Sequence, residues 1–131
     1  MIEFMVYSDP VPKGSTKAFV VNGRACTTNA NPKTKAWETL VATVAQEHRP
    51  ESLLDGPVGV SLEFELTKPK SVKREYPSVK PDVDKLTRAV LDGLTGVIFK
   101  DDAQVVVLGA QKRYGESPGV KVFVWEVGNG D

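Results

Sequence analysis

The sequence has little that would place this chain in a membrane or in a secreted compartment. No apolar run approaches the roughly 18 residues of a membrane span. Residues 1–10 lack the basic and apolar regions of a secretory signal. The single cysteine, Cys26, cannot form an intrachain disulfide. We therefore expect a reduced, cytoplasmic protein with no membrane partner.

Net charge is also absent, because 17 basic residues balance 17 acidic ones. This balance argues against a protein coated in positive charge. It leaves nucleic-acid binding open, because local patches determine such binding and a metal ion can neutralise acids. The length of 131 residues and the hydrophobic fraction of 40% suit one domain with one core.

Hydrophobic patterning predicts an α+β fold. Apolar and alternating segments predict strands at residues 2–7, 58–66, 104–114 and 120–127, and a hairpin at 19–26. The hairpin turn is Asn22-Gly23, since both positions of such a turn need a positive φ. The expected architecture is a single domain, residues 1–131, with two main helices on a mixed or antiparallel sheet. Residues 127–131 are expected to form a frayed tail.

The first helix is expected to begin at Asn31-Pro32, with Asn31 as its cap. Trp37, Leu40, Val41 and Val44 follow at i, i+3, i+4 and i+7, so they form one apolar stripe. Trp37 is therefore expected in the core rather than as a platform for a nucleic-acid base. The only histidine, His48, comes where this helix ends, where we expect it to be solvated or to cap carbonyls.

The second helix, expected over residues 83–94, has acids before, on and after it. Asp82 and Asp84 stand at its start, and Asp101 and Asp102 follow it before the next strand. The apolar residues of this helix share one face, and they are Val83, Leu86, Val90, Leu91 and Leu94. Asp84, Arg88 and Asp92 share another face at i, i+4 and i+8.

Two ordinary explanations exist for these acids. The exposed face of the helix could carry i,i+4 ion pairs worth about 0.2–0.5 kcal/mol each, and Asp82 or Asp84 could cap the helix. A cap explains one aspartate, but it leaves the other acids near this helix unexplained. Clustered carboxylates raise one another's pKa and destabilise the fold unless a positive charge lies among them. Carboxylate oxygens select hard cations, so we expect a site for Mg²⁺, or Mn²⁺ in its place.

Basic residues precede this acidic segment. Residues 68–80 contain five basic residues and one acid and read as a mobile loop, and residues 8–17 form another loop with two lysines. A basic run alone is commonly a solvated loop, but its place directly before the acids favours a phosphate-rich substrate. The candidate contacts to a DNA backbone are Lys13, Lys17, Lys70, Lys73 and Arg74.

The sequence does not match two other known kinds of acidic site. An EF-hand loop fails because Leu86 stands where a third ligand is needed and no glycine follows it. An aspartyl-phosphate phosphatase carries its D-x-D motif at the end of a hydrophobic strand, whereas a basic loop precedes Asp82.

The segment 81–106 resembles the RusA family of Holliday junction resolvases. The family shows D-x-D-N-L-x-K, then D-A-L, then D-D-A-Q-V. This chain has D-V-D-K-L-T-R at 82–88, D-G-L at 92–94 and D-D-A-Q-V at 101–105. Weaker similarity extends to the P-V-P-K-G loop and to the P-K-x-x-x-aromatic start of the first helix, so nearly the whole chain is covered.

The resemblance implies a homodimeric endonuclease that binds four-way DNA junctions and uses Mg²⁺ to nick two strands of like polarity. Asp82, Asp84 and Asp102 match the essential, metal-binding carboxylates of the family, and Arg88 stands at its catalytic lysine position. The match also gives supporting roles to Asp92 and Asp101.

Three positions depart from the family pattern. Lys85 replaces asparagine, Arg88 replaces lysine and Gly93 replaces alanine. Arginine can stabilise charge but does not readily donate a proton. Lys85 is a candidate to supply part of the missing function.

Two alternatives stay open from the sequence. A binding module for branched DNA would shift a junction without nicking it. A small-molecule phosphohydrolase would turn over free phosphomonoesters with little dependence on salt, whereas DNA binding through phosphates weakens steeply with salt.

Overall fold

The computed structural model describes residues 1–14, 16–29 and 32–128. Its elements follow the predicted order. They are β1 (Ile2–Tyr7), β2 (Thr16–Val21), β3 (Arg24–Asn29), α1 (Thr34–Gln46), β4 (Val58–Thr67), α2 (Val83–Leu94), a short 3₁₀ helix η1 (Asp102–Gln104), β5 (Val105–Gly115) and β6 (Gly119–Glu126). The α+β prediction is confirmed.

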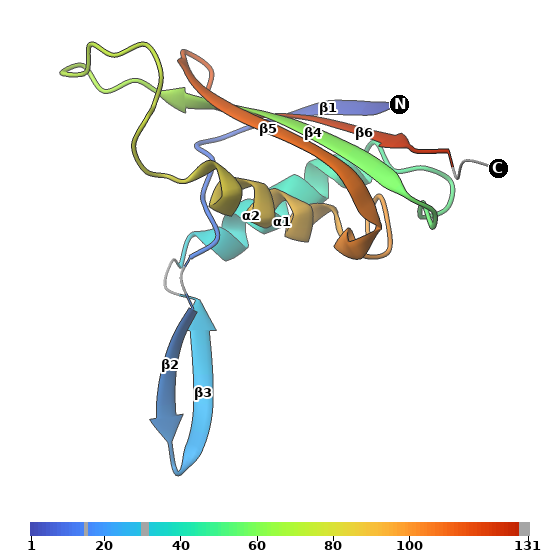
Figure 1. The fold of residues 1–131 in the computed structure, drawn as a ribbon, viewed down its shortest axis with the longest axis horizontal. Coiled ribbons are helices and arrows are strands. Elements are labelled where there is room, and N and C mark those ends of the chain that lie inside the picture. Colours follow the sequence, from blue (N-terminus) through green and yellow to red (C-terminus); the bar gives the residue numbers. More distant parts are fainter. Residues whose placement is uncertain (15, 30–31, 129–131) are drawn as a thin grey trace.

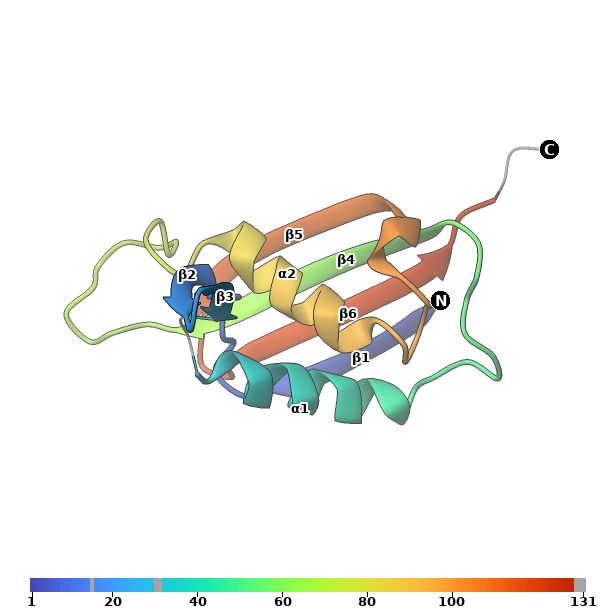
Figure 2. The same ribbon diagram turned by 90° about the horizontal axis from the view of Figure 1, so that it is seen from below.

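The main sheet is mixed, with strand order β1-β6-β4-β5. β4 and β5 are parallel because α2 carries the chain back across the sheet between them, while the other neighbouring pairs are antiparallel. Both helices lie on the same face of this sheet (Figures 1 and 2). β5 is an outer strand, and the chain enters it directly from the predicted acidic segment.

The core lies between the sheet and the two helices. α2 contributes Leu86, Val90 and Leu94, which are fully buried, as its apolar face predicted. Trp37 and Val41 of α1 are buried too, which confirms the expected stripe. α2 therefore has a fixed orientation, and its polar face points away from the core.

Gly93 brings the two helices close together. A Cβ placed on Gly93 would lie 2.9 Å from Cβ of Val41 and 3.0 Å from the carbonyl oxygen of Glu38. Such contacts are shorter than packed side chains accept, so a glycine at this position permits the observed spacing. The departure from the family's alanine thus belongs to the contact between α1 and α2.

β2 and β3 form a separate two-stranded sheet that projects away from the body (Figure 1). Its turn has φ values of 51° at Asn22 and 77° at Gly23, as the turn sequence predicted. Val20 and Val21 near the tip are exposed.

The start of α1 was predicted two residues early. The helix begins at Thr34, and Lys33 is the N-cap without a side-chain cap bond. Asn31, the predicted cap, lies outside the described residues. Pro32 precedes the helix, and the hydroxyl of Thr34, the first helical residue, donates a hydrogen bond of 2.8 Å to Pro12 O.

The tail is ordered as far as a hydrogen bond from Val127 N–H to Pro57 O, 2.9 Å long. Residues 129–131, where fraying was expected, are outside the described part of the chain. In the described residues, no helix combines the length and apolarity that crossing a membrane requires.

Candidate active site

Asp82 stands at the N-terminal end of α2 without acting as a side-chain cap. It is the N-cap residue, with φ −69° and ψ 136°, yet its carboxylate accepts no capping hydrogen bond. The ammonium of Lys85 lies 3.6 Å from its Oδ2, and about half of the Asp82 side chain is exposed. The capping explanation therefore does not account for Asp82.

Asp84 and Arg88 follow on the exposed side of α2. Among the described residues, Arg88 forms no ion pair with Asp84 or Asp92, so the alternative explanation by i,i+4 ion pairs does not account for these acids. Asp84 lies in the first helical turn, where the helix dipole favours a negative charge. These side chains remain accessible to a ligand.

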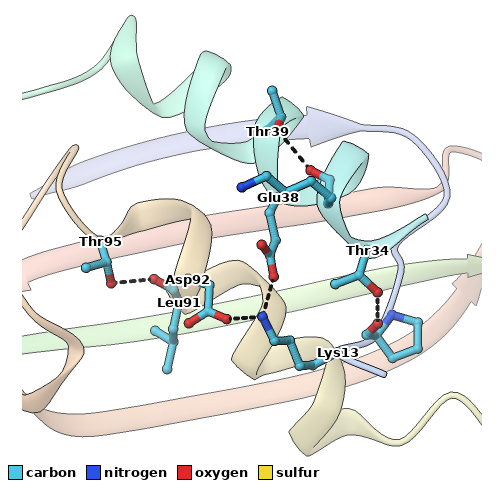
Figure 3. A network of polar contacts seen from close by, with 9 residues as sticks. Lys13, Thr34, Glu38, Thr39, Leu91, Asp92 and Thr95 are labelled. Atoms are coloured by element: carbon cyan, nitrogen blue, oxygen red, sulfur yellow. Dashed lines mark hydrogen bonds and ion pairs between the residues drawn. The ribbon is translucent and has the colours of Figure 1, made fainter. Parts of the chain in front are cut away.

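Lys13 bridges the two helices at the other end of the polar face. Its Nζ lies 2.7 Å from Oδ2 of Asp92 on α2 and 2.9 Å from Oε1 of Glu38 on α1 (Figure 3). The hydrogen bond to Asp92, and then the one to Glu38, raise the pKa of Lys13 above its ordinary value of 10.5. Lys13, predicted as a DNA contact, is held by two carboxylates.

Asp101 has a structural role. Its carboxylate accepts a 2.9 Å hydrogen bond from Ala103 N–H, and Gln104 Oε1 accepts one from Asp101 N–H, which completes a capping box. The Gln104 amide also donates to the carbonyl oxygens of Leu54 and Gly56. This network fixes the turn before β5 and thereby positions Asp102.

Asp102 lies among other acids. Partial desolvation is the largest cause that raises its pKa above the ordinary 3.8, although the residue as a whole is exposed. Hydrogen bonding with Asp101 and the charges of Asp101 and Asp92 raise its pKa further. A cation beside Asp102 would relieve this repulsion.

The structure does not bring the three predicted metal ligands into one cluster. In residues 1–14, 16–29 and 32–128, no group of three or more His, Cys, Asp or Glu side chains is arranged to hold a metal ion. Asp82 and Asp92 stand at opposite ends of α2, and a rise of about 1.5 Å per residue separates them by roughly 15 Å. Asp102 lies at the Asp92 end, so the shared ligation of one ion by Asp82, Asp84 and Asp102 stays a prediction.

The donors still fit a hard cation. They are carboxylate oxygens, and Mg²⁺ typically takes one or two carboxylates, with waters and substrate phosphate filling the other positions. Asp82 and Asp84 could supply such a partial set at one end of α2, and Asp102 at the other. Partial desolvation of Asp102, together with the neighbouring Asp101 and Asp92, raises its pKa, and a cation beside it would offset these effects.

The other predicted DNA contacts are distributed unevenly. Lys70, Lys73 and Arg74 are exposed on the loop between β4 and α2. The Arg74 guanidinium lies 6.0 Å from the centre of the Tyr114 ring, which anchors that part of the loop to β5. Lys17 lies in β2, but its side chain is outside those that the structure describes.

Sequence reasoning missed several residues. Glu38 and Gln104 were not singled out, because their partners are 25 and 50 residues away in the chain. Lys112 was also missed, and its ammonium donates to Val79 O and Pro81 O just before α2. Lys33 and Lys80 line a hollow beside Asp82.

His48 is placed by packing, since its ring stacks on Phe4 with centroids 5.1 Å apart. This contact ties the end of α1 to β1.

Comparison with known proteins gives two matches. A family model described as "Endodeoxyribonuclease RusA" matches residues 8–125 of this chain. A Bacillus subtilis (strain 168) protein named "Uncharacterized protein YqaN" is 38% identical over 138 aligned residues, which cover 96% of each chain. The region that the family model matches includes both ends of α2, the loop before β2, and the strands β4 and β5 of the main sheet with nearly all of β6, whereas β1 precedes it.

Proposed function

Because this chain belongs to the RusA endodeoxyribonuclease family, a family of Holliday junction resolvases, we propose that it nicks four-way DNA junctions in a reaction that depends on Mg²⁺. One observation carries the proposal. Asp82 and Asp84 stand at the start of α2, and the Asp82 carboxylate does not cap the helix. Lys85 lies 3.6 Å from Asp82, and three more lysines line the cavity beside it. Paired nicks in strands of like polarity would resolve the junction during recombination or repair.

Asp82, Asp84 and Asp102 are the proposed metal-binding carboxylates, with DNA phosphate and water as the remaining ligands. When bound, Mg²⁺ or Mn²⁺ supplies positive charge to phosphate oxygens and lowers the pKa of a coordinated water. Because the acids occupy two ends of α2, one ion at each end fits their positions better than a single shared ion. Asp92 is a supporting acid at the Asp102 end.

Arg88 and Lys85 provide the cationic groups closest to the proposed reaction. Water attacks phosphorus, a P–O bond forms, and the bond to the 3′ oxygen breaks, leaving a 5′-phosphate and a 3′-hydroxyl. We assign Arg88 to the negative charge that develops on the phosphoryl oxygens, since a guanidinium binds two of them together. Lys85, which already contacts Asp82, is the supporting group that can give the leaving oxygen a proton.

A homodimer would place two such sites on opposed strands of a twofold junction. The outer strand β5 supports this part of the proposal. Val106, Val107 and Leu108 on it are 60%, 47% and 50% exposed, and an exposed apolar edge strand favours pairing with a second copy. A Val107→Lys variant should be monomeric in light scattering, whereas an unchanged dimer would exclude this interface.

The proposal is tested by incubating the protein with labelled four-way, three-way, forked and linear DNA, with and without Mg²⁺. We expect Mg²⁺-dependent nicks, symmetric across the four-way junction. Asp82→Asn should bind the junction and leave it intact. Binding without any nicking by the wild-type chain would instead support a DNA-binding module, and undiminished nicking by Asp82→Asn would refute its assignment.

A further inference from the structure

A cavity of about 550 Å³ lies beside Asp82, and most of its lining residues have no role in the reaction described above. The loop residues 9–14, which join β1 to β2, form one wall. Lys80 and Pro81, just before α2, form the opposite wall, and Lys33 and Lys85 complete it. The volume is within the usual range for pockets that bind small organic groups, about 300–1,000 Å³.

The rim of this cavity is predominantly basic. Four lysines from separate parts of the chain line it, against the two acids Asp9 and Asp82. Lys13 is occupied by Glu38 and Asp92, and Lys85 lies near Asp82. Lys80 is exposed and has no ion-pair partner among the described residues. This distribution favours an anionic group on the Lys80 side.

The inner wall is apolar. Pro10, Val11, Pro12 and Pro81 line the same cavity as the lysines. A site for phosphate alone needs only hydrogen-bond donors and positive charge. The proline rings and the Val11 side chain would gain free energy by burying apolar surface against a base or a sugar. The combination of a cationic rim and an apolar wall matches a nucleotide, which has both kinds of surface.

The wall is held in place before any ligand binds. Lys13 N–H donates a 2.9 Å hydrogen bond to Lys85 O on α2, and the Thr34 hydroxyl on α1 bonds to Pro12 O. These bonds join the loop 9–14 to both helices, so the cavity does not have to be assembled by the ligand. Preorganisation of this kind lowers the entropy lost on binding.

We propose that this cavity takes one unstacked nucleotide of the DNA, next to the phosphodiester that is cut. Its base or sugar lies against Val11 and the prolines, and its phosphate lies near Lys80. This inference rests on the proposed function and adds how the enzyme selects its substrate. Extruding a nucleotide from a stacked duplex costs a few kcal/mol of unstacking and unpairing free energy. At a branch point the cost is lower because stacking and pairing are already weakened there.

The first experiment uses four-way junctions with 2-aminopurine at successive positions around the mapped nick. Wild-type protein is added in EDTA, so that the DNA stays intact. We expect the fluorescence at one position beside the nick to rise severalfold, because the base leaves its stack. Nicking in Mg²⁺ with no brightened position would overturn this inference and leave the proposed function standing. Absence of nicking would count against the proposed function itself.

A charge variant tests the phosphate side. Lys80→Gln should reduce the magnitude of the negative slope of log affinity against log salt concentration by about one, and it should weaken the fluorescence increase. Lys100→Gln, which removes a lysine on the far side of α2, should retain the brightening. If Lys80→Gln keeps both the slope and the brightening, the phosphate assignment is wrong. An abasic residue at the bright position should weaken wild-type binding without changing the slope.

Free ligands distinguish a nucleotide from phosphate alone. Deoxyadenosine monophosphate should shift the amide signals of Val11 and Gly14 in the wild-type protein, and inorganic phosphate at equal concentration should shift them less. Equal responses to both would identify a phosphate site and overturn the nucleotide assignment.

Discussion

The two ends of α2 carry the same residue type in opposite electrostatic settings. At the N-terminal end, Asp82 has Lys85 nearby and a basic cavity beside it. At the C-terminal end, Lys13 forms ion pairs with Asp92 and Glu38, while the charges of Asp101 and Asp92 act on Asp102. The first end therefore combines an acid with several lysines, whereas at the second end Asp102 has acidic neighbours that raise its pKa.

This difference shows that a count of acids is a poor guide to a metal site. Asp101 and Asp102 both belong to the D-D-A-Q-V motif, yet the Asp101 carboxylate already accepts a hydrogen bond in the capping box. Asp92 is used in the bridge between the helices. The contacts that each carboxylate already makes decide which ones remain for an ion.

Neutralising an acid at either end gives the largest expected effect. Asp84→Asn and Asp102→Asn should each slow nicking by on the order of 10²–10³-fold, since each removes charge that the reaction needs. If both ends serve one reaction, the double variant should be no slower than the slower single variant. Single-turnover nicking of a labelled junction measures this, with Glu51→Gln as an exposed control. Losses that multiply in the double variant would show that the two ends act independently.

Breaking the bridge at the C-terminal end should lower stability. Lys13→Met leaves Glu38 and Asp92 facing each other without their shared cation, and because these side chains are partly exposed, this should cost about 1 kcal/mol of unfolding free energy. Urea unfolding followed by circular dichroism gives the value, and Lys100→Met is the matched control. An equal effect in both variants would mean that the bridge contributes nothing specific.

The spacing of α1 and α2 can be changed at Gly93. Gly93→Ala places a methyl group against Val41, and overpacking of this kind costs about 1–3 kcal/mol, offset by about 1 kcal/mol of helix propensity. We expect a net loss of stability on thermal unfolding. Gly56→Ala, where a Cβ would meet nothing within 4 Å, should be nearly neutral. A stabilised Gly93→Ala variant would show that the helices separate without cost.

The smallest effect concerns pH. A carboxyl whose pKa is raised in the folded state destabilises that state once it is ionised, so the cost is present at neutral pH and disappears as pH falls below the ordinary 3.8. Asp102→Asn should therefore unfold at a slightly higher temperature than wild type at pH 7, and the difference should shrink in acid. A variant that is less stable than wild type at pH 7, without metal, would contradict this sign.

Much of the fold follows from local patterns. The bounds of α2, the Asn22-Gly23 turn and the alternation of β4 are set by neighbouring residues, and the structure agrees with each. The start of α1 was placed two residues early because Asn31-Pro32 fits a local capping pattern, whereas the helix begins at Thr34. The Thr34 hydroxyl bonds to Pro12 O, 22 residues earlier, and such a partner leaves no periodic signal in the sequence.

The candidate site was less accessible to sequence reasoning. Motif spacing identified the acids, but it could not show which of them already had partners. Lys13 looked like a surface cation because Glu38 and Asp92 are remote from it in the sequence. The separation of Asp82 from Asp92 follows from helix geometry alone and could have been anticipated.

The Gln104 side chain fastens the turn before β5 to the carbonyls of Leu54 and Gly56, which lie 50 and 48 residues earlier. The connection between α1 and β4 therefore helps to set the position of Asp102, although it contains none of the residues proposed to react. Lengthening or shortening that connection by a residue is expected to move Asp102 relative to α2 while every motif stays intact.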